Sequence, residues 1–222
     1  MLKALVLAGI ALADPALSAP RAGRLLLNPE AAEVNAKAPA AFRIRLETTK
    51  GVVMVEVRRE WAPLGVDRFF NLARAGYYDD MRLTRIVAPK WAQFGIHGDP
   101  KVAQAWRERR IADDPRVLPN ERGTIAFAYA VPNGRTTQVF INLRDNTQTH
   151  DREPFVPFGR VIAGMDVVDS WYSGYGEDSG GGIRGGRQTR LFESGNRFLD
   201  YAFPQLDSIR RALVLEGANG SR

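Results

Sequence analysis

The sequence has no cysteine and only two histidines, His97 and His150, among its 222 residues. The lack of cysteine excludes zinc ribbons, iron–sulfur clusters, thiol nucleophiles and thiol-based redox motifs. Two histidines leave almost nothing for a polyhistidine metal site. We therefore expect no cofactor-borne metal chemistry. The chain needs no such support, because a domain of this length buries roughly 70% of the surface that its unfolded form exposes.

Lysine is scarce as well, with five residues, so that arginine supplies most of the 31 positive charges. The 25 acidic residues leave a formal net charge of +6. Such an excess suggests anionic partners but does not establish them. The densest basic runs, Arg107 to Arg110 and Arg184 to Arg190, have acidic residues nearby. We do not expect nucleic-acid binding, which would require both runs to converge on one face.

The sequence also has few long apolar runs, and the apolar run near the N-terminus is too short to span a bilayer. Within residues 1–19, Lys3 precedes an apolar stretch that ends at Ala13, and small residues follow. This order is typical of a secretory signal peptide and predicts a periplasmic or secreted protein. An apolar N-terminal helix packed on the domain is the alternative. Residues 20–41, rich in Ala and Pro, predict a linker or arm with a short helix beginning at Asn28.

The common motifs for nucleotide binding and hydrolysis are absent. The sequence contains no G-x-x-x-x-G-K-[ST], H-E-x-x-H or G-x-S-x-G. Gly180, Gly182 and Gly185 satisfy G-x-G-x-x-G, but no predicted strand precedes them and no predicted helix follows. A dinucleotide site requires that context, so we predict a flexible loop there.

Short elements follow one another from Phe42 onwards. Apolar residues first alternate with charged ones, and a second β-rich run begins at Val52 after a turn, which predicts a β-hairpin. Apolar residues at i, i+3, i+4 and i+7 from Val66 predict a helix that ends at Gly76. Further strands are predicted at 81–87, 123–130, 137–143 and 155–162, and further helices at 165–172 and 205–215. This mainly-β pattern favours a closed or nearly closed antiparallel barrel with helices over its ends.

Many short segments occur in the order and at the spacings of one family. They are Glu47–Gly51, Trp61–Pro63, Phe69–Leu72, Gly76–Tyr78, Leu83–Val87, Gln93–Gly95, Gly98–Asp99, Arg122–Ile125, Pro132–Asn133, Thr137–Ile141, Pro157–Gly159 and Gly164–Val168. Together they resemble a cyclophilin-type peptidyl-prolyl isomerase over residues 42–199, here a bacterial and exported one. The resemblance implies a closed eight-stranded antiparallel β-barrel capped by two helices, to which residues 20–41 add an N-terminal arm and residues 200–222 a C-terminal helix.

The resemblance also implies where the site lies. Arg85 matches the family's catalytic arginine, and Gln93 and Phe140 match residues that act beside it. The positions implied to bind substrate are Phe127, Ala128, Tyr129, Gln138, His150, Phe155, Trp91 and Lys90. Without the resemblance, the arginine would be read as a solvated strand residue, and Phe127 and Phe140 as barrel core.

The reaction that the resemblance implies is rotation about an X-Pro bond, for which no cofactor is expected because it involves neither redox chemistry nor group transfer. This rotation is slow because amide resonance raises a barrier of about 18–20 kcal/mol. In the twisted transition state the prolyl nitrogen loses conjugation and becomes a better hydrogen-bond acceptor, so a fixed guanidinium donor favours that state. Arg85 is the candidate donor, and Phe127, Phe140 and Phe155 are the candidate pocket for the pyrrolidine ring. Gln93 is expected to orient the arginine or hold the substrate carbonyl.

Several positions depart from the family pattern. Lys90 stands where a pocket phenylalanine is usual, and Trp91 follows it. If either side chain obstructs the pocket, the protein is a peptide-binding or chaperone module with little catalysis, which is the alternative function. The loop tryptophan that binds cyclosporin in many members has no counterpart near Thr149, which predicts weak inhibition by that drug.

The expected partners follow from the same resemblance. They are proline-containing peptides and unfolded, exported client proteins. The protein is expected to be a monomer and, once the leader is removed, to contact no membrane.

Overall fold

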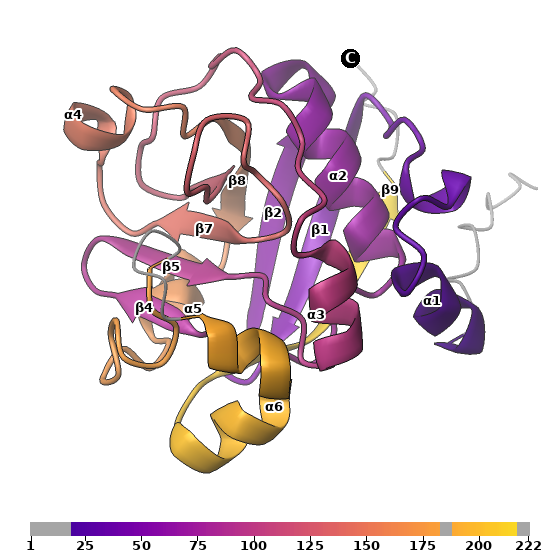
Figure 1. Ribbon diagram of the computed structural model, residues 1–222. Coiled ribbons are helices and arrows are strands. Elements are labelled where there is room, and N and C mark those ends of the chain that lie inside the picture. The colour runs from indigo at the N-terminus through magenta and orange to yellow at the C-terminus, as the bar shows by residue number, and fades with distance from the viewer. Residues whose placement is uncertain (1–18, 183–187, 217–222) are drawn as a thin grey trace, which may run out of the picture.

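The computed structural model describes residues 19–182 and 188–216 (Figure 1). Within these residues nine antiparallel strands form one sheet in the order β3-β9-β1-β2-β8-β6-β7-β5-β4. The strands are β1 (Ala41–Thr48), β2 (Val52–Arg58), β3 (Met81–Arg82), β4 (Arg85–Val87), β5 (Trp91–Phe94), β6 (Thr124–Phe127), β7 (Val139–Asn142), β8 (Pro157–Ala163) and β9 (Ser208–Glu216). The helices are α1 (Ala19–Leu26), α2 (Pro63–Arg74), α3 (Pro100–Trp106), α4 (Thr147–His150), α5 (Met165–Asp169) and α6 (Thr189–Ala202), with 3₁₀ turns at Ala32–Val34 and Arg59–Trp61.

The sheet curls on itself, which confirms the expected mainly-β, antiparallel, barrel-like class (Figure 1). The structure differs in detail from the expected closed barrel of eight strands. The sheet has nine strands within the described residues, and the segment predicted as one strand at 81–87 forms two strands, β3 and β4. Met81 of β3 pairs with Ile209 of β9, whereas Arg85 of β4 pairs with Gln93 of β5. These two short strands are the edges of the sheet, although they are neighbours in the sequence.

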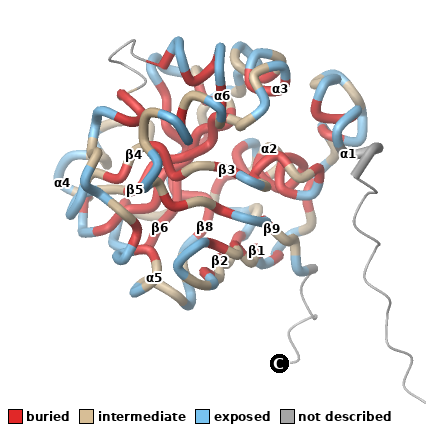
Figure 2. The backbone as a smooth tube through the Cα atoms, turned by 90° about the horizontal axis from the view of Figure 1, so that it is seen from below, coloured by how far each residue is buried: buried red, intermediate tan, exposed pale blue. Residues whose placement is uncertain are grey.

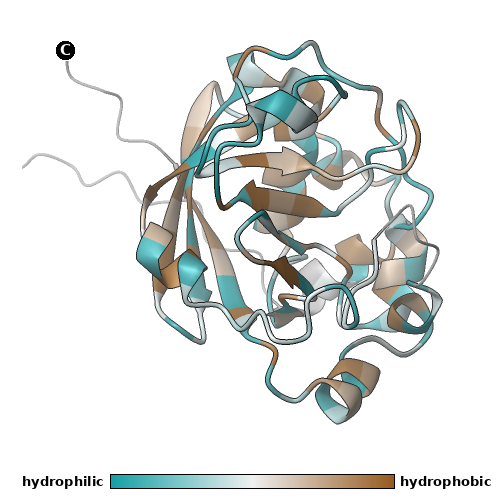
Figure 3. Cartoon of the chain, turned by 90° about the vertical axis from the view of Figure 1, so that its left-hand side faces the viewer, coloured by the Kyte–Doolittle hydropathy of each residue, from teal (hydrophilic) through white to brown (hydrophobic). Residues whose placement is uncertain are grey.

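The core lies inside the curled sheet and under α2. Figure 2 shows the buried residues along the strands and α2, and Figure 3 shows the apolar colour concentrated on the strands, with polar colour on most loops. The predicted hairpin is confirmed as β1 and β2, and the predicted helix as α2. Phe69 of α2 packs on Phe158 of β8 and on Tyr78, with ring centroids 4.8 and 5.1 Å apart.

The C-terminal helix predicted at 205–215 is wrong. Ser208–Glu216 is strand β9, which lies between β1 and β3 and pairs with β1 along most of its length. Apolar residues at 206, 209 and 213 fit a helical spacing, but a short apolar run also fits a strand. The N–H and C=O groups on the outer side of β1 need partners, and β9 supplies them. The predicted helical extension over residues 200–222 is therefore absent from 203–216, and residues 200–202 are the end of α6.

Several elements, among them α4, were not predicted from the sequence. Strand β5 follows β4 after a tight turn, and α3 and α6 pack together through a small apolar cluster that includes Ala103 and Leu199. The predicted helix at 165–172 is present as the shorter α5. Among the described residues, no helix combines the length and the apolar character needed to cross a membrane.

The N-terminal arm is more ordered than a linker. Helix α1 buries Leu25 and Leu26 against the domain, and Trp106 Nε1 donates to the carbonyl of Leu26 at 2.8 Å. The chain turns after Asn28, where a helix was predicted to begin, and forms only a 3₁₀ turn at Ala32–Val34. The predicted signal peptide, apart from Ala19, and most of the predicted flexible loop after Gly182 lie outside the described residues.

Candidate active site

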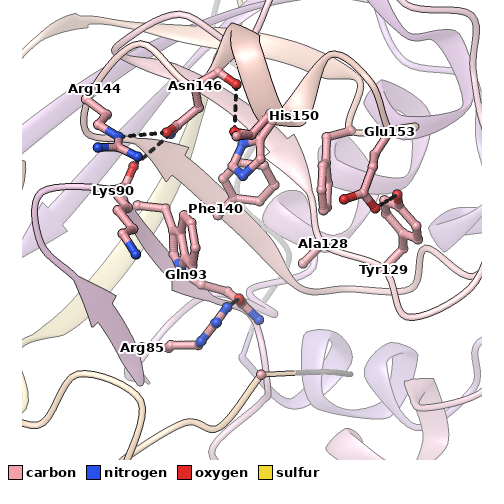
Figure 4. A pocket seen from close by; sticks show the side chains of 14 residues that line it. Arg85, Lys90, Gln93, Ala128, Tyr129, Phe140, Arg144, Asn146, His150 and Glu153 are labelled. Carbon is pink, nitrogen blue, oxygen red and sulfur yellow. Dashed lines mark hydrogen bonds between the residues drawn. The ribbon is translucent and has the colours of Figure 1, made fainter. Parts of the chain in front are cut away.

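A cavity of about 400 Å³ opens beside β4, β5, β7 and α4 (Figure 4). All predicted site residues except Phe127 and Gln138 line it. The other lining residues, which the sequence did not indicate, are Arg144, Asn146, Thr149, Glu153 and Gly182. Those five belong to loops and to the short helix α4, where no periodic pattern marks a residue as facing a site.

One row of residues across the sheet places the centre of the site. Arg85 of β4 pairs with Gln93 of β5, Gln93 pairs with Phe140 of β7, and Phe140 pairs with Ala126 of β6. Directly paired residues on neighbouring strands project to the same face of a sheet. Four strands therefore bring these side chains together. The interval of eight residues between Arg85 and Gln93 is the register of the tight β4–β5 hairpin.

Aromatic rings form the floor and the walls of the cavity. Phe140 is 4% exposed and lies in a small apolar cluster with Ala126 and Ala128, against which Trp91 and Phe155 pack. Its ring meets Phe155 edge to face, with centroids 5.3 Å apart and planes at 89°. A flat, apolar recess of this kind suits a pyrrolidine ring.

Phe127 does not line the cavity, contrary to the prediction. Its side chain is fully buried in the main core, 5.1 Å from the ring of Phe158. Alternate residues of a strand point to opposite faces, so Ala126 and Ala128 face the cavity and Phe127 faces the barrel interior. Ala126 and Ala128 pack against Phe140, and Ala128 lines the cavity.

Arg85 is held on several sides. Its Nε and Nη2 donate to Oε2 and Oε1 of Glu177, both at 2.7 Å, and its Nη1 donates to Oε1 of Gln93 at 2.6 Å. The guanidinium carbon also lies 5.1 Å from the ring centroid of Trp91. The side chain is only 16% exposed, yet it borders the cavity.

Three glutamines form a buried chain behind the arginine. Gln93 Nε2 donates to Gln138 Oε1 at 2.9 Å, and Gln138 Nε2 donates to Gln188 Oε1 at 2.9 Å. Because the amide nitrogen of Gln93 is engaged in this way, its oxygen faces the guanidinium. Gln138 therefore lies behind the cavity and orients Gln93, rather than lining the cavity as predicted. Gln188 was not indicated by the sequence, because it lies 50 residues beyond Gln138.

Lys90 and Trp91, the two departures from the family pattern, lie at the edge of the open cavity. Trp91 stands between Arg85 and His150, with its ring centroid 5.6 Å from the imidazole centroid. It is a wall of the cavity. Lys90 is exposed, with its Nζ 5.8 Å from the Trp91 ring centroid. Arg85 and Phe140 both remain in the lining, as the catalytic interpretation requires.

His150 closes the side opposite Arg85. Its ring lies 5.3 Å from Phe140 and 4.8 Å from Phe155 between centroids. Burial lowers the pKa of His150 and outweighs the opposing effects of Glu153 and Asp151, while Arg144 adds the smallest effect, in the same direction as burial. The imidazole is therefore neutral at pH 7 and adds an uncharged wall.

The rim of the cavity carries charge of both signs. Tyr129 donates its hydroxyl to Oε2 of Glu153 at 2.8 Å on one side. On the other side Arg144 Nε donates to Asn146 Oδ1 at 3.1 Å, and Lys90 lies nearby (Figure 4). Asn146 Nδ2 also donates to the carbonyl of Lys90, which fixes the two loops to each other. Within the described chain, no group of three or more His, Asp or Glu residues is placed to hold a metal ion.

Comparison with known families agrees with this geometry. Residues 43–181 match the model of the cyclophilin type peptidyl-prolyl cis-trans isomerases. The chain belongs to the cyclophilin family. The cyclophilin segment thus covers β1 from Arg43, the whole Arg85–Gln93–Phe140 row and the loop that carries Glu177, but not α6 and β9.

Curated cyclophilins and a solved cyclophilin structure resemble the chain at low identity. Peptidyl-prolyl cis-trans isomerase cyp18 of Streptomyces antibioticus is 29% identical over 138 residues, which are 57% of this chain and 81% of that protein. Peptidyl-prolyl cis-trans isomerase B of Escherichia coli is 28% identical over 133 residues, with the same coverage of 57% and 81%. A crystal structure of a Cryptosporidium parvum cyclophilin superposes with a TM-score of 0.57 at 19% identity, covering 79% of this chain and 99% of that one.

Proposed function

We propose that this cyclophilin-type peptidyl-prolyl cis-trans isomerase binds the proline ring over Phe140 and uses Arg85 as the donor to the prolyl nitrogen. The single observation that carries the assignment is the cross-strand row in which Arg85, Gln93 and Phe140 stand side by side at the cavity. A related cyclophilin crystal structure was determined in the presence of the dipeptide Ala-Pro, which is the class of ligand expected here.

The proposed mechanism requires no covalent step. The apolar floor holds the ring while the chain on the other side of the X-Pro bond rotates. As the amide twists, the lone pair of the prolyl nitrogen is no longer delocalised, and the guanidinium hydrogen bond to it is stronger than in either planar form. Because Arg85 is largely shielded from water, one donor of this kind lowers the barrier by about 2–4 kcal/mol.

The test is the isomerisation rate of a short X-Pro peptide with the purified protein, beside an Arg85→Ala variant. A rate well above the uncatalysed one, reduced at least about tenfold in the variant, is the expected result, since 1.4 kcal/mol corresponds to a factor of ten. A folded wild type that binds proline peptides without accelerating rotation would contradict it. That outcome would favour the binding-module alternative.

We also propose that the clients are exported proteins. The proposal is supported by the leader-like order of charge, apolar stretch and small residues within residues 1–19. A fusion of this segment to a reporter enzyme that is active only outside the cytoplasm tests it. Reporter activity that is lost when the apolar stretch is broken by two charged residues is expected. A fusion that stays inactive and cytoplasmic would contradict the export proposal.

A further inference from the structure

The loop after α5 brings a carboxylate to the catalytic arginine. Glu177 lies 92 residues beyond Arg85, and its two oxygens accept from Arg85 Nε and Nη2 at 2.7 Å each. Two parallel N–H···O bonds of this kind fix the plane of a guanidinium as well as its position. The sequence gives no local signal for this pair, because the partners belong to segments that meet only in the folded chain.

The loop itself is anchored against the strand segment that carries Arg85. Ser179 Oγ, in a residue that is 1% exposed, donates to the carbonyl of Thr84 at 2.7 Å. Gly180 approaches so closely that a Cβ at this position would lie 2.5 Å from the Thr84 carbonyl and 2.8 Å from Arg85 Cβ. Gly181 N then donates to the carbonyl of Glu177 at 2.8 Å. The carboxylate therefore takes its place from the fold and not from a chance contact of two long surface side chains.

Three groups then determine where the guanidinium can point. Glu177 engages Nε and Nη2, Gln93 engages Nη1, and the ring of Trp91 lies 5.1 Å from the guanidinium carbon. A guanidinium has five N–H groups, so two remain beyond the three that these bonds use. The negative charge also offsets the cost of shielding a permanently charged side chain from water.

We propose that Glu177 is a positioning residue for Arg85, holding the guanidinium in the orientation from which it donates to the prolyl nitrogen. This inference rests on the proposed function, because it assigns Arg85 the donor role. It goes beyond it by adding to the site a residue outside the cavity lining. An ion pair that restrained the arginine away from the substrate would predict the opposite change in rate when the carboxylate is removed.

The chain offers a closely matched control. Arg82 donates from Nε and Nη2 to the two oxygens of Asp200 at 2.7 and 3.0 Å. Both arginine side chains are 16% exposed, and the carboxylate side chains are 50% exposed in Glu177 and 54% in Asp200. Arg82 and Asp200 do not line the cavity. Glu177→Gln and Asp200→Asn therefore remove one carboxylate charge each from pairs of the same geometry, only one of which adjoins the site.

The first readout is peptide isomerisation with full-length proteins whose folding is checked by circular dichroism. In Glu177→Gln we expect kcat to fall about tenfold with KM little changed, because a misplaced group costs up to about a hundredfold while the aromatic floor is untouched. Glu177→Asp keeps the carboxylate on a shorter side chain and should retain an intermediate rate. Asp200→Asn should match the wild type. A rate that is unchanged or raised in Glu177→Gln, or reduced equally in Asp200→Asn, would overturn the proposal.

The second readout does not depend on activity. The Nε–H group of Arg85, assigned by comparison with Arg85→Lys, should give a dispersed, slowly exchanging signal in ¹⁵N–¹H spectra of the wild type. The signal should move to the position of free arginine in Glu177→Gln and stay in place in Asp200→Asn. If the wild type is inactive yet the signal responds in this way, the proposed function fails and the positioning contact stands. If the signal does not respond, Glu177 does not hold Arg85.

Discussion

Arg82 and Arg85 lie three positions apart and form similar ion pairs, yet only Arg85 borders the candidate active-site cavity. Each forms a two-pronged ion pair with a carboxylate from the C-terminal part of the chain, and each is 16% exposed. Arg82 makes its remaining contacts with Asp80, to whose Oδ1 and carbonyl its Nη1 donates. Arg85 instead has Gln93 beside it and Trp91 against its face.

The comparison shows that the ion pair alone does not define a catalytic arginine. Burial lowers the pKa of Arg82, but the hydrogen bonds to Asp200 and Asp80 raise it by more, so that it stays charged at any ordinary pH. The pair ties β3 to α6. At Arg85 the same kind of pair stands at one end of a row that continues into Gln93 and Phe140. The difference lies in what is next to the guanidinium, an apolar cavity in one case and further carboxylate in the other.

The largest expected contrast comes from replacing each arginine by lysine. Arg85→Lys keeps the positive charge but loses the planar fork, and we expect kcat/KM to fall by about a hundredfold, as for loss of one preorganised donor. Arg82→Lys should leave kcat/KM unchanged. Both rates are measured with the same X-Pro peptide. Equal losses in the two variants would remove the distinction between the arginines.

A second contrast uses the two faces of the sheet next to Arg85. Phe140→Leu keeps an apolar floor but loses the ring stacking, and kcat/KM should fall by up to about tenfold, because aromatic contacts contribute about 0.5–1.5 kcal/mol beyond their area. Phe127→Leu should lower the free energy of unfolding by a similar amount and leave kcat/KM unchanged. Denaturant unfolding and the peptide assay measure the two effects. A loss of activity per folded molecule in Phe127→Leu would show that Phe127 contributes to the active site after all.

A third contrast compares the two histidines, of which His150 lines the cavity and His97 does not. Burial lowers the pKa of both His150 and His97 below the ordinary value of 6.5. The unfolded chain then binds more protons than the folded one. The contribution of each histidine to the free energy of unfolding is therefore fully present above about pH 6.5 and is lost as the pH falls, by at most about 1.4 kcal/mol per pH unit for each proton.

Replacement of either histidine by glutamine should therefore flatten the stability curve between pH 7 and 5. A bound peptide shields His150 further from water and favours its neutral form, so the peptide affinity of the wild type should fall at acidic pH. Only His150→Gln should reduce this fall. Unfolding and peptide-binding titrations over this pH range provide the check. The idea fails if His97→Gln changes the affinity profile as much as His150→Gln does.

The smallest effect is expected at the control pair. Asp200→Asn neutralises the half-exposed carboxylate of this pair while Asp80 still pairs with Arg82, and the free energy of unfolding should fall by at most about 1 kcal/mol, since an ion pair with a solvated partner contributes little. Thermal unfolding in low and in high salt measures it, and added salt should reduce the difference. A larger loss would mean that Arg82 depends on Asp200 for more than a surface contact.

Features of the fold could be predicted from the sequence where they depend on residues that are neighbours in the chain. The hairpin of β1 and β2 and helix α2 follow from periodicity. Arg85 and Gln93 were indicated by the resemblance alone, and their pairing across β4 and β5 was not predicted. Phe127 was misplaced because the resemblance gives a position in the chain and not a face of the strand. Ser208–Glu216 was mistaken for a helix because its partner, β1, lies more than 150 residues earlier in the sequence.

The sequence by itself determined the kind of barrel and the family, and through the resemblance it indicated Arg85, Gln93 and Phe140 as candidate site residues, because repeating patterns and short motifs are properties of neighbouring residues. Only the tertiary structure decided that Glu177 reaches Arg85, that Gln138 and Gln188 orient Gln93, and that β9 completes the sheet. These contacts join segments many tens of residues apart. Which distant groups meet depends on how the whole chain buries its apolar surface and satisfies its strand edges, and no local pattern records that outcome.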